Sequence, residues 1–250
     1  MSLQEDRVLV ENVVLQQIKL KKHTLDLFVS PCNLFIPNAV SRLFSKVVRI
    51  DEDDTVFDIG TGTGVLGIWA ALEDSEIVFA VDPVEEHCEL AMQNAQSNGV
   101  GEKFVVRCGS LFEPLADNLR ADVIIGDVSG IADGPGKALG WYSDSVPTGG
   151  GDGTEVVVEM IDKSRQRLAK GGRLYFPVAV GLSNDERVME VARACYGNLK
   201  QVVDVWFPLS EEEYDIVSCC LPQSMLDKVR RKGSRMAWNG HIFEATQPIM

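Results

Sequence analysis

Three glycines at alternate positions, directly after a short apolar strand that holds one aspartate, constrain this chain more than any other feature. Residues 56–64 read Val-Phe-Asp-Ile-Gly-Thr-Gly-Thr-Gly, with Asp58 two residues before the first glycine. An apolar strand is expected at 55–59 and a helix at 65–72. Glycine permits a tight turn and a close backbone approach, and the free N–H groups that open the helix then face a polar ligand group. The pattern predicts a ligand-binding turn in an α/β fold.

A second acidic residue supports that interpretation. Asp82 closes the next apolar strand, at 77–81, at about the 20-residue distance where nucleotide-binding units take a ribose hydroxyl pair. A dinucleotide fingerprint reads Gly-x-Gly-x-x-Gly, whereas these glycines keep a strict two-residue spacing. The loop resembles motif I of class I S-adenosylmethionine (AdoMet) dependent methyltransferases, where it passes under the amino acid part of the ligand. A dinucleotide site and a bare structural turn are the alternatives.

Short β-branched runs alternate with helical periodicity from residue 55 onward, which predicts a parallel sheet with helices on both faces. The expected helix at 83–98 has one face formed by Val84, Cys88, Ala91, Met92 and Ala95. Further helices are expected at 154–170 and 184–196, and further strands at 103–107, 122–125, 173–180, 201–207 and 215–221. A short acidic loop joins the last two strands, so an antiparallel pair is expected at one edge.

The expected fold class is therefore α/β, a Rossmann-like seven-stranded, mostly parallel sheet with helices on both faces and an antiparallel edge hairpin. An AdoMet-binding core is expected at 51–221, between an N-terminal helical and aromatic lid extension at 1–50 and a C-terminal extension at 222–250. Helical periodicity at Val10, Val13 and Val14 suggests the N-terminal helix, and a strand is expected at 241–245.

The segment 127–152 is unusual for its length without periodicity. It holds seven glycines, two prolines and the pair Trp141-Tyr142, and it begins at the carboxyl end of a strand, where open α/β sheets bind ligands. Such long segments usually form lids or binding loops. A surface excursion is the alternative.

Composition limits the partners. The formal net charge of −13 argues against a surface that tracks nucleic acid, although one basic cluster lies at 228–235. Six scattered cysteines and three dispersed histidines suggest reduced, buried thiols and no metal site. No secretory signal or membrane span is expected, so the predicted location is cytoplasmic. A homodimer is considered as a partner, while nucleic acid and membrane are not.

Four stretches resemble the release-factor glutamine methyltransferases and their small-domain relatives. These are Ile36-Pro37, the glycine loop with Asp82, the segment Gly-Ser-Leu-Phe-Glu-Pro at 109–114, and Gly-Gly-Gly-Asp-Gly at 149–153. The resemblance covers about residues 25–180 and implies AdoMet as cofactor. That family carries Asn-Pro-Pro-Tyr after the fourth strand, where this chain has Asp127-Val128-Ser129-Gly130. Amide methylation through that motif is therefore not expected.

The candidate residues follow from these motifs. Asp127 and Tyr142 are the candidate catalytic residues, with Asp127 orienting an amine or alcohol or acting as base. Cofactor binding is assigned to Asp58, Gly60, Thr61, Gly62, Gly64, Asp82, Pro83, Ser110, Leu111 and Asp127. Substrate contacts are assigned to Phe28, Phe35, Trp141 and Tyr142.

The function expected from these residues is methyl transfer from AdoMet to a nitrogen or oxygen nucleophile of a small biosynthetic metabolite, with a protein side chain left open. One alternative is γ-carbon chemistry on AdoMet, in which intramolecular cyclisation gives azetidine-2-carboxylate and methylthioadenosine. The other is a non-catalytic AdoMet-binding subunit that supports a partner.

Overall fold

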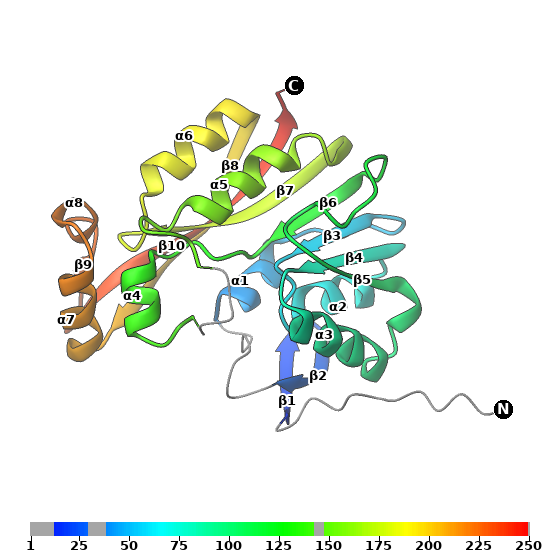
Figure 1. Ribbon diagram of the computed structural model, residues 1–250, viewed down its shortest axis with the longest axis horizontal. Helices are drawn as coiled ribbons and strands as arrows, with labels where there is room; N and C mark the ends of the chain where they lie inside the picture. Colours follow the sequence, from blue (N-terminus) through cyan, green and yellow to red (C-terminus); the bar gives the residue numbers. More distant parts are fainter. Residues whose placement is uncertain (1–12, 30–38, 143–147, 250) are drawn as a thin grey trace.

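A twisted sheet forms the centre of the protein, seen in a computed structural model that describes residues 13–29, 39–142 and 148–249 (Figure 1). Its strands run in the order β5-β4-β3-β6-β7-β10-β8, and a short β9 pairs with β10. Their bounds are β3 Thr55–Ile59, β4 Ile77–Asp82, β5 Phe104–Cys108, β6 Ala121–Gly126, β7 Leu168–Val180, β8 Tyr196–Leu209, β9 Arg230–Lys232 and β10 Arg235–Pro248. The predicted fold class is confirmed.

Helices cover both faces of the sheet because neighbouring strand residues point in opposite directions. On one face, Val56 and Ile125 pack with α1 (Ala39–Val47), α2 (Val65–Leu72) and α3 (Glu85–Ser97). On the other face, Phe57 and Ile124 pack with α5 (Glu155–Ser164) and α6 (Asp185–Cys195). Met92 was expected on the buried face of α3, but it is 48% exposed.

The antiparallel strand is β10, and its pairing differs from the one expected. β10 lies between β7 and β8 and pairs antiparallel with both, so the segment after residue 221 supplies an interior strand. The strand expected at 215–221 is wrong, because residues 211–220 form helix α7 (Glu211–Cys220). A capping box between Ser210 and Glu213 starts this helix and outweighs its β-branched residues. Cys219 and Cys220 on this helix are exposed, contrary to the expected buried thiols.

The N-terminal part also differs from the expectation. Val13 precedes and Val14 begins a strand, so their helical interpretation is wrong, while Val10 lies outside the described residues. Strands β1 (Val14–Leu20) and β2 (His23–Val29) form a separate antiparallel hairpin that packs beside α2 and α3. Alternate residues Leu25, Leu27 and Val29 of β2 are buried in the same core as the first helices.

Shorter elements complete the chain. The segment 127–152 contains a short helix α4 (Asp133–Ala138), and η1 (Gly101–Lys103) precedes β5. The helix expected at 154–170 ends at Ser164, because β7 already begins at Leu168. After α7 comes α8 (Gln223–Leu226). None of the helices in the described part of the chain is long and apolar enough to cross a membrane.

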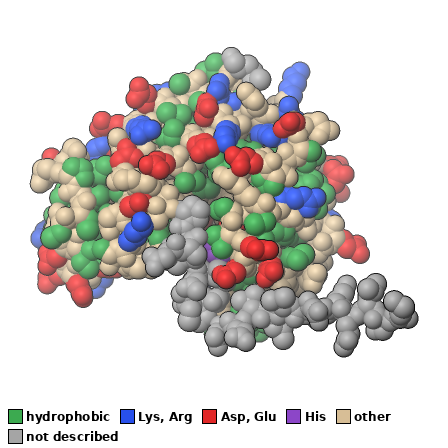
Figure 2. Space-filling model, viewed as in Figure 1, with side chains coloured by type: hydrophobic (Ala, Val, Ile, Leu, Met, Phe, Trp, Pro, Cys, Tyr) green, Lys and Arg blue, Asp and Glu red, His purple; other side chains and the backbone are tan. Residues whose placement is uncertain are grey.

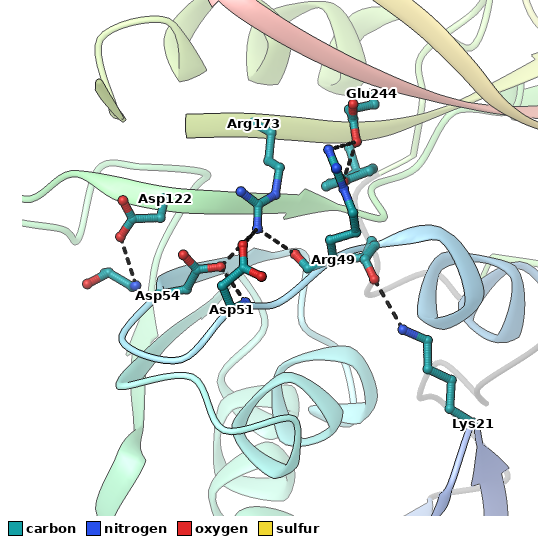
Figure 3. A network of polar contacts seen from close by, with 10 residues as sticks. Lys21, Arg49, Asp51, Asp54, Asp122, Arg173 and Glu244 are labelled. Carbon is teal, nitrogen blue, oxygen red and sulfur yellow. Dashed lines mark hydrogen bonds and ion pairs between the residues drawn. The ribbon is translucent and has the colours of Figure 1, made fainter. Parts of the chain in front are cut away.

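A network of charges fixes the amino ends of the strands, opposite the glycine loop (Figure 3). The Nη2 atom of Arg173 on β7 lies 3.0 Å from carboxylate oxygens of both Asp51 and Asp54, and 2.9 Å from the carbonyl oxygen of Arg49. Burial raises the pKa of the Asp54 carboxyl, whereas the Asp51 N–H and the Arg173 charge lower it. Arg173 therefore stabilises the segment between α1 and β3 against β7.

Replacing Arg173 should destabilise the fold. Arg173→Met leaves the Asp54 carboxylate buried without its cation, which should lower the free energy of unfolding by about 2 kcal/mol. Urea denaturation followed by circular dichroism measures this change. The matched control is Arg120→Met, since Arg120 is exposed and donates to carbonyl groups of Asp117 and Leu119 in its own turn. Equal unfolding midpoints for the two variants would contradict the prediction.

Candidate active site

Three adjacent strand ends bring the candidate residues into one row. In the parallel register, Ile59 of β3 lies between Val81 of β4 and Gly126 of β6. The next residue on each strand is Gly60, Asp82 or Asp127, so these three meet at the carboxyl edge of the sheet. Ligands of open α/β sheets bind at this edge.

The glycine loop passes close to both neighbouring segments. Gly60, Gly62 and Gly64 have positive φ angles of 77°, 54° and 84°, which disfavour a side chain. A Cβ on Gly60 would lie 3.1 Å from Val128 Cγ1, and one on Gly64 would lie 3.2 Å from the Cβ of Ala91 on α3. The loop must therefore remain glycine for β6 and α3 to approach it.

The Asp58 side chain supports the loop from inside. Its Oδ2 accepts from the Thr61 hydroxyl at 2.6 Å and from the Gly67 N–H at 2.9 Å. Burial raises the pKa of Asp58 to about 6, against the lowering effect of these two donors, and the Asp82 charge raises it further. Asp58 and the Thr61 hydroxyl, both assigned to the cofactor, thus bind each other within the loop.

Asp82 connects β4, the glycine loop and α3. Its Oδ2 accepts from the Gly62 N–H at 2.9 Å, and its Oδ1 accepts from the Val84 N–H at 3.0 Å and lies 2.9 Å from His87 Nδ1. A carboxylate offers about four lone-pair positions, so three are used and one on Oδ2 remains for a ligand. Pro83 is exposed at the turn into α3.

The residues at this edge fit AdoMet. The loop N–H groups lie at the carboxyl edge of the sheet, and the Asp82 carboxylate, which accepts from the Gly62 N–H, has one acceptor position unused by the described residues, which suits a ribose hydroxyl. Two buried polar atoms, Thr63 Oγ1 and His87 Nε2, have no hydrogen-bond partner among the described residues. Buried polar groups normally have partners, so both atoms suit a polar ligand.

The segment expected beside the adenine follows β5. Gly109 donates its N–H to the Asp82 carbonyl at 2.9 Å, which places this turn against the ribose-binding candidate. Ser110 is exposed, and Leu111 is buried with a φ of 49°. A positive φ is costly for leucine, and such strain tends to occur at ligand sites. Both residues remain predictions for the adenine edge.

Asp127 directly follows β6, next to the glycine loop, where the sequence predicts that the methyl acceptor binds. Its Oδ2 accepts from the Ser41 hydroxyl of α1 at 3.3 Å. Burial raises the pKa of Asp127 to about 7; the Ser41 hydrogen bond lowers it and the Asp58 charge raises it. A carboxyl group with this pKa can hold or release a proton near neutral pH, which suits a general base.

Tyr142 contacts the turn that follows Asp127, and its catalytic role stays a prediction. Its hydroxyl oxygen accepts from the Ile131 N–H at 3.1 Å, and its ring packs so closely on Gly136 that a Cβ there would lie 2.5 Å away. Burial raises the pKa of Tyr142 to about 12, while hydrogen bonds from Ile131 and Ser129 lower it. The phenol thus holds the segment after Asp127 and stays protonated at neutral pH.

The aromatic candidates are only partly brought to the site. Phe28 lies near the glycine loop, because Asn94 Nδ2 donates to the carbonyl oxygens of both Phe28 and Thr63. The Trp141 side chain is part of a residue that is 37% exposed, and the backbone N–H of Trp141 donates to the Gly136 carbonyl. Phe35 lies outside the described residues.

Sequence reasoning missed Ser41, His87 and Asn94. His87, Ala91 and Asn94 follow a helical i, i+4, i+7 spacing on the side of α3 that faces the loop, and this spacing was the available signal. The interpretation followed only the apolar residues of that helix.

Comparisons with known proteins agree with this geometry. The family model described as "Ribosomal protein L11 methyltransferase (PrmA)" matches residues 42–130. A ribosomal protein L11 methyltransferase of Pelotomaculum thermopropionicum is 41% identical over 87 residues, 35% of this chain and 27% of the relative. A release factor glutamine methyltransferase of Bacillus anthracis is 26% identical over 162 residues, covering 62% of this chain and 56% of the relative.

A solved structure shows the same fold. The ribosomal protein L11 methylase of Lactobacillus delbrueckii subsp. bulgaricus aligns with a TM-score of 0.56 and 16% identity, covering 88% of this chain and 84% of that chain. Residues 42–130 therefore resemble the class I AdoMet-dependent methyltransferases, as the motifs indicated, and this resemblance implies AdoMet as cofactor. The matched part spans about a quarter of the L11 methyltransferase relatives.

The expected small-molecule acceptor is wrong. The curated relatives are named as methyltransferases of ribosomal proteins L11 and uL3 and of release factors, all of which are proteins. The acidic composition and the absence of an appended nucleic-acid module carried that expectation; both argue against a nucleic acid and neither argues against a protein acceptor.

Weakening the Asp82 acceptor should reduce cofactor affinity. Asp82→Asn replaces a charged acceptor with a neutral amide that repels the Gly62 or Val84 N–H, so the affinity for S-adenosylhomocysteine should fall about 10-fold to 100-fold. Isothermal titration calorimetry measures the affinity. Glu85→Gln, an exposed carboxylate in the first turn of α3, serves as control. Wild-type affinity in Asp82→Asn would remove the ribose assignment.

Proposed function

We propose that this protein is an AdoMet-dependent methyltransferase whose acceptor is an amine of a protein, either a lysine side chain or an N-terminal amino group. The observation that carries the proposal is the position of Asp127: its backbone carbonyl would lie 3.4 Å from a Cβ on Gly60 of the glycine loop, and its carboxyl accepts from the Ser41 hydroxyl. Burial raises the pKa of this carboxyl to about 7. The named relatives support a protein acceptor.

The residues at the acceptor side favour an amine. An amine nucleophile arrives as an ammonium ion at neutral pH and must lose a proton before it can attack. Asp127 in its ionised form can accept that proton, and Ser41 holds its Oδ2 in place. A side-chain amide would instead need carbonyl acceptors of the Asn-Pro-Pro-Tyr kind, which residues 127–130 do not supply.

AdoMet supplies an electrophilic methyl group on a sulfonium. The amine nitrogen forms the new C–N bond as the S–C bond breaks, the electron pair of that bond stays on sulfur, and the proton of the amine passes to Asp127. In this scheme the glycine loop binds the methionine part, Asp82 and Pro83 the ribose, and Ser110 with Leu111 the adenine edge. The protein contributes alignment of donor and acceptor, which is the main requirement of such a displacement.

A transfer assay tests the function. The purified protein is incubated with methyl-labelled AdoMet and, separately, with ribosomal protein L11, ribosomal protein uL3 and a release factor. We expect label in a protein band, equimolar S-adenosylhomocysteine, and methylation at an amine by mass spectrometry. Methylthioadenosine formed from AdoMet alone would contradict methyl transfer and favour γ-carbon chemistry.

Removing the Asp127 charge should separate binding from turnover. Asp127→Asn should bind S-adenosylhomocysteine within about threefold of wild type, because its role is with the acceptor, and should lose about 100-fold or more in kcat. In the wild type, kcat/KM should rise with pH through about 7, because this ratio reports the ionisation of Asp127 in the free enzyme. A pH–rate profile measures this limb, and Asp133→Asn, an acidic residue on α4 paired with Lys137, is the control.

Stability gives an independent check on the same carboxyl. The folded pKa of Asp127 is raised above its ordinary value of 3.8 to about 7, so ionisation favours the unfolded chain. Its contribution to the free energy of unfolding should fall as pH rises from about 4 to about 7. In Asp127→Asn the free energy of unfolding should therefore change less steeply with pH over this range.

The activity measurements have their own contradicting outcome. Full activity of Asp127→Asn with an unchanged pH–rate profile would exclude Asp127 as base.

A further inference from the structure

One buried amide joins the N-terminal hairpin to the glycine loop. Asn94 on α3 is 0% exposed, and its side chain makes three hydrogen bonds. Its Oδ1 accepts from the Phe28 N–H at 2.7 Å, and its Nδ2 donates to the Phe28 carbonyl at 3.0 Å and to the Thr63 carbonyl at 2.9 Å. Both protons of the amide nitrogen are therefore used, one on β2 and one on the glycine loop.

A neighbouring asparagine makes an almost identical set of bonds without touching the loop. Asn98 Oδ1 accepts from the Asp26 N–H at 3.0 Å, and Asn98 Nδ2 donates to the Asp26 carbonyl at 2.8 Å. Its second proton goes to the Asn94 carbonyl at 2.8 Å, within α3 itself. Each asparagine thus binds the N–H and the carbonyl of one residue on β2, and these two bonds suffice to hold that strand. The third bond of Asn94, to the Thr63 carbonyl, is the feature that distinguishes it from Asn98.

The position of Thr63 makes this bond important for the site. Thr63 lies between Gly62, whose N–H donates to Asp82, and Gly64, whose approach to Ala91 leaves no room for a side chain. The loop backbone between these glycines has little steric restraint of its own, because both glycines adopt positive φ angles. A fixed donor at the Thr63 carbonyl sets the orientation of that peptide group.

We propose that Asn94 is a positioning residue for the cofactor loop and that strand β2 is, through it, a structural part of the cofactor site. The proposal rests on the AdoMet binding in the proposed function. The side-chain amide of Asn94 bridges the Thr63 carbonyl and the Phe28 peptide group, so the glycine loop and the hairpin keep a fixed relative position. Cofactor affinity then depends on a contact made outside the loop and its acidic partner.

Two pairs of variants test this role. Asn94→Asp keeps the acceptor for the Phe28 N–H but turns an oxygen toward two carbonyl groups, and Asn94→Ala removes all three bonds. Asn98→Asp and Asn98→Ala are the matched controls on the same helix. We expect the Asn94 variants to lose about tenfold in affinity for S-adenosylhomocysteine, and the Asn98 variants to stay within about twofold.

The readouts separate positioning from general stability. Both pairs should lower the melting temperature, because each breaks bonds to β2, whereas only the Asn94 pair should lower the affinity in calorimetry and raise the KM for AdoMet more than it changes kcat. Wild-type affinity in folded Asn94 variants would overturn the proposal. Wild-type protein that fails to bind S-adenosylhomocysteine would instead overturn the cofactor assignment in the proposed function.

A measurement on the unmodified protein covers the case in which the Asn94 variants do not fold. Amide hydrogen exchange is followed by NMR with and without S-adenosylhomocysteine. If Asn94 couples β2 to the loop, ligand binding should slow exchange of the Phe28 N–H several-fold and leave the Asp26 N–H nearly unchanged. Equal changes at the two amides, or none at either, would count against the proposal.

Discussion

The carboxylate of Asp82 holds together the segments from which the site is built. Its two oxygens accept from the glycine loop at Gly62 and from the start of α3 at Val84, and Oδ1 also contacts His87. The carbonyl of the same residue accepts from Gly109, the first residue of the next candidate turn. One residue at a strand end thereby fixes the loop, the helix and the turn at 109–111 relative to each other, so a loss at this position would affect all three.

The site is strongly acidic, and this fits a cationic ligand. Asp58, Asp82 and Asp127 lie on three adjacent strands or their ends, and Asp58 interacts unfavourably with both of the others. Burial raises the pKa of a carboxyl group that has no cation nearby, and it raises the pKa of both Asp58 and Asp127. A sulfonium or an ammonium placed among them would favour the ionised forms. Ligand binding should therefore lower the Asp127 pKa and prepare that group to accept a proton. Figure 2 shows acidic and basic side chains interspersed over the visible face of the protein.

Sequence patterns predicted the parts of the site that depend on local order. Asp82 and Asp127 were found because each directly follows an apolar strand, and parallel strands end at the same edge. β10 was missed as an interior strand because its pairing with β7 joins residues far apart in the chain. Asn94 was missed because its partners, Phe28 and Thr63, come from segments that the helix pattern of 83–98 does not describe. The hairpin of β1 and β2 was not predicted, because the helical spacing of Val10, Val13 and Val14 was followed and the alternation at Leu25, Leu27 and Val29 was not.

The acceptor side shows how this chain does without the rigid Asn-Pro-Pro-Tyr segment. Prolines would fix the backbone after the fourth strand by themselves, whereas residues 127–131 are held from outside. The Tyr142 hydroxyl binds the Ile131 N–H, and the glycines of the 149–153 loop pack on the same turn, since a Cβ on Gly149 would lie 2.6 Å from the Ile131 carbonyl and one on Gly153 would lie 2.6 Å from the Ala132 nitrogen. The Asp133 N–H donates to the Gly150 carbonyl at 3.0 Å. Because this turn follows Asp127 directly, the packing that replaces the prolines also sets where the candidate base stands. In the proposed function, the Asp127 carboxylate takes the place of the amide acceptor of that segment, and the substrate is an amine instead of an amide.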